Sequence, residues 1–141
     1  GGPAGAGRRG GAGEQGGGVA RFQGGGRGLG GVVGDATVVA MRAHGATSIT
    51  AALGPCIHAG CYEFAEADLG GIAATFGNDV RGLTSHGTAA LDVPATVRLA
   101  LANADVALAH DESACTACTP GYWSHRARGD KGRQATVAWL V

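Results

Sequence analysis

Four cysteines have the spacing that most directly suggests chemistry: Cys56, Cys61, Cys115 and Cys118. They form a C-x4-C pair and a C-x2-C pair, and more than fifty residues separate the two pairs. If two loops brought the pairs together, four thiolates could bind a structural zinc ion. Two disulfides are a second possibility, although the absence of an export signal favours reduced thiols or metal ligands. Because the zinc spacing is imperfect, we predict buried or partly buried free thiols and no metal ligands.

Arg27 is the best candidate for binding an anion such as phosphate. It lies in the glycine-rich stretch Gly24–Gly31. A guanidinium presents several fixed donors to phosphate, and neighbouring glycines expose backbone amides. The alternative is a surface arginine in a flexible loop, since Gly-Arg-Gly arises easily in glycine-rich sequence.

A second group of basic residues precedes the C-terminus, and His125, Arg126 and Arg133 are weaker candidates from it. They could contact phosphate or a nucleoside, and a histidine could act as a base because it titrates near neutral pH. The alternative is a solvated charged loop, which is favoured because Asp130 can pair with a neighbouring arginine.

Helices and strands alternate along the chain and indicate an α+β fold. Apolar residues recur at helical spacing over residues 32–44, and Gly45 is well placed to end that helix. A further helix is predicted over residues 66–76 and another over 93–104, where Asp92 can cap the first turn and Pro94 fits within it. Strands are predicted over residues 48–53, 106–109 and 135–141.

Composition limits the classes of partner. The 11 basic and 11 acidic residues give zero net charge, so no general field attracts nucleic acid or an anionic membrane. No apolar run reaches the roughly 20 residues that span a bilayer, and no secretory signal is recognised, so a cytoplasmic protein is expected. Residues 1–18 are rich in glycine and are predicted to be disordered, whereas residues 19–141 are predicted to form the folded domain.

Three segments, in this order, resemble one known family. The first combines Gly54-Pro55-Cys56-Ile57 with Cys61-Tyr62-Glu63, and the second is Leu91-Asp92 at a helix start. The third is a closing block, made of Cys115-Thr116, Ser124-His125-Arg126-Ala127-Arg128 and Gly132-Arg133. Together they are similar to the C-terminal part of the zinc-dependent purine nucleoside phosphorylases that were once labelled polyphenol oxidases or multicopper laccases.

The resemblance also covers residues 19–41, where Arg27-Gly28-Leu29 fixes the register. In the family, a histidine before this motif is one of three zinc ligands, and the others are an earlier histidine and an earlier cysteine. Gln23 stands at that histidine position here, and the segment that would carry the other two ligands is missing or replaced by residues 1–18. Zinc is therefore the expected family cofactor, but the chain is not expected to bind it in the family's manner.

The resemblance implies phosphorolysis of adenosine, inosine and methylthioadenosine, with adenosine deaminase activity. The expected ligands are thus a purine nucleoside and phosphate. The implied architecture is an α-β-β-α sandwich of mixed sheets flanked by helices, in an incomplete version. An incomplete sheet has an exposed edge, so a homo-oligomer is expected. The alternative hypothesis is a catalytically dead or truncated relative that acts as a self-associating module without enzymatic activity.

Overall fold

A computed structural model describes residues 31–135 of the chain. The expectations for residues 1–18 and for Gln23 and Arg27 lie outside the described residues, as does nearly all of the predicted terminal strand. Within the described part, no helix is both long enough and apolar enough to cross a membrane.

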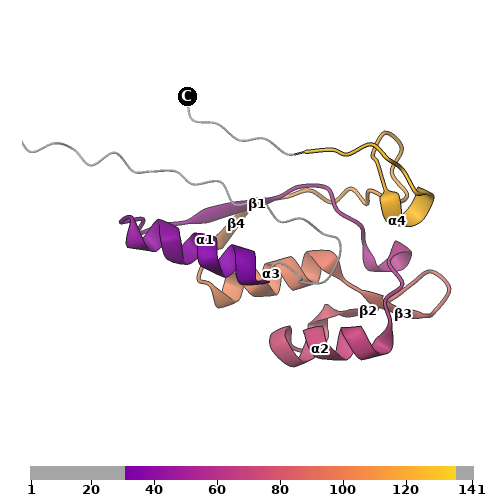
Figure 1. The fold of residues 1–141 in the computed structure, drawn as a ribbon, viewed down its shortest axis with the longest axis horizontal. Coiled ribbons are helices and arrows are strands. Elements are labelled where there is room, and N and C mark those ends of the chain that lie inside the picture. The colour runs from indigo at the N-terminus through magenta and orange to yellow at the C-terminus, as the bar shows by residue number, and fades with distance from the viewer. Residues whose placement is uncertain (1–30, 136–141) are drawn as a thin grey trace, which may run out of the picture.

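Two parallel strands form the centre of the first of two structural units. β1 (Thr50–Leu53) pairs with β4 (Ala107–Asp111) from Thr50 opposite Ala107 to Leu53 opposite Asp111, with an irregularity after Ala51. More than fifty residues of chain connect the two strands. Their carboxyl ends therefore lie side by side, although they are far apart in sequence (Figure 1).

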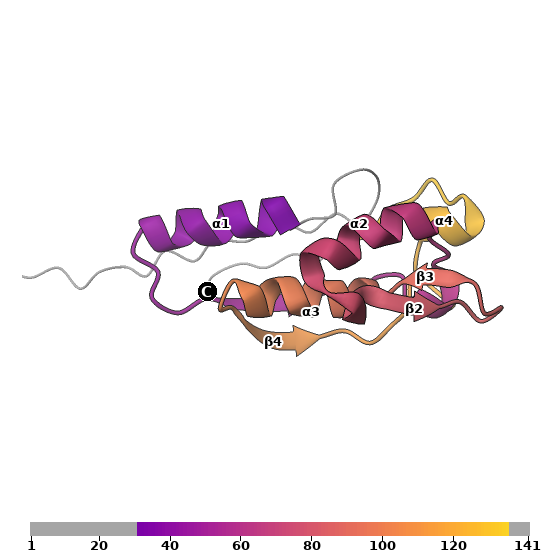
Figure 2. The ribbon, with the colours of Figure 1, turned by 90° about the horizontal axis from the view of Figure 1, so that it is seen from below.

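Helices α1 (Gly31–Ala43) and α3 (Val93–Asn103) pack with this sheet around a small apolar core. Ile49, Leu101 and Val106 are buried there, and Val38 and Met41 of α1 pack against them. In Figure 2, α3 lies between α1 and β4. Helices therefore cover one face of the sheet.

The ends of these helices follow local chemistry that the sequence predicts. Asp92 accepts a hydrogen bond from the amide of Ala95 at 2.9 Å and so caps α3, with Pro94 in the first turn. Gly45 follows α1 with φ of +94°, a conformation that costs glycine little. Arg42 near the end of α1 donates to the carbonyls of Ala104 and Asp105, both at 3.1 Å, which fastens α1 to the end of α3.

The second structural unit is a helix packed on a hairpin, and its residues lie between β1 and β4 in the sequence. α2 (Glu66–Phe76) is followed by a short 3₁₀ helix, η2 (Asn78–Val80), and then by β2 (Arg81–Leu83). β2 pairs antiparallel with β3 (Ala89–Leu91). The core of this unit consists of four buried side chains: Leu69, Val80, Leu91 and Val93. The hairpin was not predicted, because its strands have three residues each and lack β-branched or aromatic side chains.

The segment that follows β4 folds back toward the middle of the chain. The first 3₁₀ turn, η1 (Ala59–Cys61), lies after β1, and a four-residue helix, α4 (His125–Arg128), lies near the C-terminus. The charged segment was expected to be a loop, but Ser124 accepts a hydrogen bond from the amide of Ala127 at 3.3 Å and caps this helical turn.

The α+β prediction is confirmed for the described residues, which have helices with one small parallel and one small antiparallel sheet. On the face of the parallel sheet away from the core, the paired residues Thr50 and Ala107, and Ala52 and His110, are exposed. This exposed face, made mostly of small side chains, agrees with an incomplete version of the expected sandwich among the described residues.

Candidate functional site

The parallel pairing of β1 with β4 brings the two cysteine pairs together. The turns that follow the two strands meet, because Cys56 forms an isolated parallel bridge with Cys115 and the amide of Thr116 donates to the carbonyl of Cys56 at 3.0 Å. Cys61 in η1 reaches the same place. The sulfur atoms of Cys61, Cys115 and Cys118 all lie within 4.8 Å of one another, and we call these three residues the sulfur cluster.

Cys115 is the buried centre of the sulfur cluster, with 6% of its surface exposed. Burial opposes ionisation of its thiol, but hydrogen bonds lower its pKa. The donors are the backbone amides of His58, Ala117 and Cys118 and the thiol of Cys118. The His58 amide lies 3.4 Å from the sulfur. The thiol of Cys115 therefore ionises more readily than that of an ordinary cysteine.

The thiols of Cys56 and Cys61 hold their protons more firmly. Desolvation is the main cause that raises the pKa of Cys61 to about 11, and the Cys118 thiol and the charge of Cys115 add to it. Burial, followed by the charge of Cys115, raises the pKa of Cys56 to about 11. All four cysteines are free thiols, of which Cys61 and Cys118 are exposed. The cluster thus combines a buried thiol of lowered pKa with two exposed thiols, and it is open to solvent on one side.

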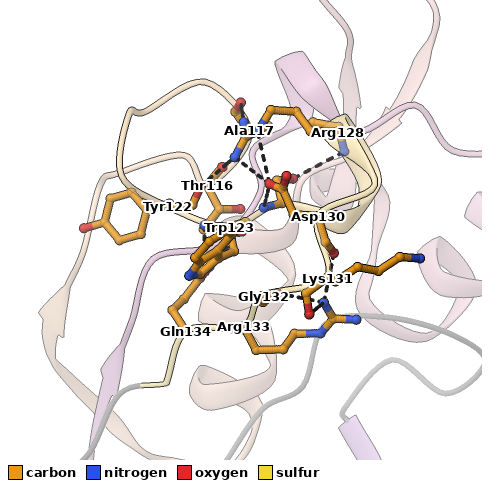
Figure 3. A network of polar contacts seen from close by, with 12 residues as sticks. Thr116, Ala117, Tyr122, Trp123, Arg128, Asp130, Lys131, Gly132, Arg133 and Gln134 are labelled. Carbon is orange, nitrogen blue, oxygen red and sulfur yellow. Dashed lines mark hydrogen bonds and ion pairs between the residues drawn. The ribbon is translucent and has the colours of Figure 1, made fainter.

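Arg128 holds the loop that carries the C-x2-C pair (Figure 3). Its guanidinium donates to the carbonyls of Ala117 and Tyr122, and it forms an ion pair with Asp130 at 3.0 Å. The backbone amide of Ser124 donates to Asp130 at 2.8 Å, and this bond, with the charge of Arg128, lowers the pKa of the carboxyl. The predicted pairing of Asp130 with a nearby arginine is confirmed.

Two of the weaker candidates also make backbone contacts. Arg126 donates to the carbonyl of Glu63 at 2.7 Å, and its guanidinium carbon lies 5.2 Å from the centre of the Tyr62 ring. This cation–π contact attaches α4 to the segment after Cys61. Arg133 donates to the carbonyls of residues 130–132. His125 is exposed and contributes to lowering the pKa of Asp130. A contact with substrate stays a prediction for all three residues.

A shallow depression adjoins the sulfur cluster, and Cys118 belongs to both. Its walls are Cys118, Thr119, Pro120, Gly121, Tyr122, Trp123, Arg128 and Asp130. Trp123 is half exposed, and a Cβ on Gly132 would lie 2.5 Å from its indole ring, so the glycine is required for this close packing. Gln134 exchanges hydrogen bonds with the backbone of Trp123 (Figure 3).

The structure brings together three possible metal ligands that the sequence analysis did not group as a site. Three of the four cysteines converge, while Cys56 lies outside the cluster. Among residues 36–135, whose side chains the structure describes, no other three side chains of the His, Cys, Asp and Glu types come as close to one another. The signal in the sequence was the C-x2-C pair, but only the pairing of β1 with β4 shows which third cysteine joins it.

The comparisons with known proteins identify a family. A family model described as multi-copper polyphenol oxidoreductase laccase matches residues 12–141. No curated protein and no solved structure matches the chain significantly. The match covers most of the chain and includes all three motif segments, and the chain therefore belongs to the multi-copper polyphenol oxidoreductase laccase family.

Proposed function

We propose that this chain is part of a zinc-dependent purine nucleoside phosphorylase that also deaminates adenosine. The observation that supports the proposal most strongly is the family match over residues 12–141. Contacts between the motifs add support. Arg126 joins the closing block to Tyr62 and Glu63, and Arg128 reaches the carbonyls of Thr116 and Ala117. The segments that carry the resemblance thus form one structural unit.

The proposed ligands are a purine nucleoside and phosphate, without nucleic acid. In phosphorolysis, a phosphate oxygen attacks C1′ of the ribose and the purine leaves. In deamination, water attacks C6 of adenosine and ammonia leaves. Phosphorolysis additionally requires a group that holds a phosphate anion, and we assign that role to Arg27. His125, Arg126 and Arg133 are weaker candidates for contact with the nucleoside or phosphate.

The zinc ion of the proposed enzyme would polarise an oxygen nucleophile. A His/His/Cys ligand set does not fit residues 31–135, where the one close group of three ligating side chains consists of sulfurs only. The same residues do not offer the mixed histidine and cysteine ligands of a blue-copper centre. The proposal therefore places the catalytic ligands outside residues 31–135, and the described part supports the fold around them.

The test compares this chain with a hybrid in which the N-terminal part of an active family member is joined ahead of residue 19 and Gln23→His restores the third ligand. Both proteins are incubated with adenosine, phosphate and zinc, and adenine and inosine are separated by chromatography. We expect little or no product from the chain and clear product from the hybrid. A hybrid that folds and binds zinc but releases neither product would refute the proposal.

A variant of the hybrid tests the role of Arg27. Arg27→Ala should reduce release of adenine far more than release of inosine, because only phosphorolysis uses phosphate. Arg42→Ala serves as the matched control, because Arg42 lies outside the glycine-rich stretch and its guanidinium binds backbone carbonyls. Equal losses of both products in Arg27→Ala would contradict the assignment.

A self-associating module without enzymatic activity is the second candidate, and one observation favours it. The parallel sheet of the described residues has only two strands, and its outer face is exposed. Parallel strands are usually buried on both faces, so a second copy could cover them. Sedimentation should then show association that grows with concentration. A monomer at high concentration would exclude this function.

A further inference from the structure

We propose that the sulfur cluster of Cys61, Cys115 and Cys118 is a binding site for one zinc-like divalent cation, separate from the His/His/Cys site expected of the family. The three sulfurs lie within 4.8 Å of one another. Three sulfurs bound to one tetrahedral zinc, each about 2.3 Å from the metal, are about 3.8 Å apart. Small rotations of the three side chains would therefore close the site without a change of the backbone.

The backbone around the cluster is already organised. Cys115 is fixed by its bridge to Cys56, and the amide of Thr119 donates to the carbonyl of Cys115 at 2.9 Å, which closes the C-x2-C turn. The amide of Cys61 donates to the carbonyl of His58 at 3.0 Å within η1. The ligands thus come from two turns that meet regardless of a metal, so little ordering is needed on binding.

The electrostatics of the cluster favour a cation. Backbone amides stabilise negative charge on Cys115, and the thiols of Cys118 and Cys61 surround it. A divalent cation would take the place of the thiol protons and neutralise most of the charge of three thiolates.

The exposure of the cluster determines what kind of site it is. Cys115 is buried, whereas Cys61 and Cys118 are exposed. A metal can therefore enter from solvent, and with three protein ligands the fourth tetrahedral position is left for water or an external ligand. The adjoining depression begins at Cys118, so an external ligand would approach from there. Such a site would also connect the turn after β1 to the turn after β4.

Cobalt and zinc titrations of the reduced, metal-free chain of residues 1–141 test the inference. We expect one Co²⁺ per chain, with an intense thiolate-to-metal charge-transfer band in the near ultraviolet that Zn²⁺ abolishes. Cys61→Ser and Cys118→Ser should each weaken binding by on the order of a hundredfold, because each removes one of three ligands. Both residues are exposed, so neither change should disturb the fold, which circular dichroism checks.

Cys56→Ser is the matched control, because Cys56 adjoins the cluster but is not part of it. It should keep the affinity and the charge-transfer band of the unaltered chain. Absence of that band, or an affinity unchanged in Cys61→Ser, would overturn the inference. So would a Cys115–Cys118 disulfide that persists under reductant. Because binding is measured by spectrum and not by activity, the result is independent of whether the proposed function holds.

Discussion

Leu91→Ala tests whether the unit formed by α2 and the hairpin has a packed core. Leu91 has none of its surface exposed and lies in one cluster with Leu69, Val80 and Val93. Removing a buried leucine side chain to Cβ costs about 3 kcal/mol, from lost apolar burial and from the cavity that remains. For a domain of this size, we expect the melting temperature to fall by roughly 10 to 20 °C.

The same hairpin offers a matched control, since Leu83 in β2 is 67% exposed. Leu83→Ala makes the same chemical change without a cavity and should shift the free energy of unfolding by less than about 0.5 kcal/mol. Urea unfolding followed by circular dichroism measures both variants, and an unchanged slope with denaturant shows that the midpoints are comparable. Equal losses in the two variants would refute the packing described for Leu91.

Three further predictions concern single side chains. Asp92→Ala should lower the free energy of unfolding by about 1 kcal/mol because α3 loses its cap, whereas Asp92→Ser should restore most of it; equal urea midpoints for the two would contradict the capping role. The pKa of Asp130 is lower in the folded state, so its stabilising effect is present above the unfolded pKa of about 4 and is lost as pH falls through the folded value. Asp130→Asn should therefore reduce the stability that is lost between neutral and acid pH, as measured by urea midpoints. Asp79→Asn, a control at an exposed residue, should leave that loss unchanged. Identical acid profiles for Asp130→Asn and the unaltered chain would argue against the contact with Ser124. Alkylation of Cys61, followed by mass spectrometry, should be slow at neutral pH despite its exposure and should accelerate until the pH approaches its pKa of about 11. A rate at neutral pH equal to that of a simple thiol such as glutathione would count against this raised pKa.

The helices could be predicted from the sequence because their ends are determined locally. α2 has the predicted bounds of Glu66 and Phe76, and α3 begins after Asp92, as its capping residue and Pro94 indicate. α1 ends before Gly45, as expected. Each of these signals acts within one helical turn, so no knowledge of the rest of the fold is required.

The hairpin could not be predicted, because its stability comes from tertiary packing. β2 and β3 are short, and residues Gly82, Ala89 and Ala90 have low strand propensity. A Cβ on Gly82 would lie 2.6 Å from the Cβ of Ala59, so the glycine permits close contact with η1. Contacts with a distant segment, which the local sequence does not encode, therefore determine this element.

The candidate site was predicted only in part, for a related reason. The C-x4-C and C-x2-C pairs were recognised, but all four cysteines were weighed as one tetrathiolate, and free thiols were preferred. The geometry separates Cys56 from the other three, because Cys56 lies in the bridge with Cys115 while Cys61 turns toward Cys118 through η1. Strand register and the direction of one 3₁₀ turn decide this arrangement, and neither is visible in residue spacing.

The long connection between the two parallel strands has a kinetic consequence. α2 can form from neighbouring residues, and the hairpin needs contacts no farther away in the chain than η1, but β1 meets β4 only after a loop of more than fifty residues has closed. Loop closure of this length delays the contacts that depend on it. The cysteines should thus assemble late during folding, and the native thiol arrangement should arise only in molecules whose local elements are already in place.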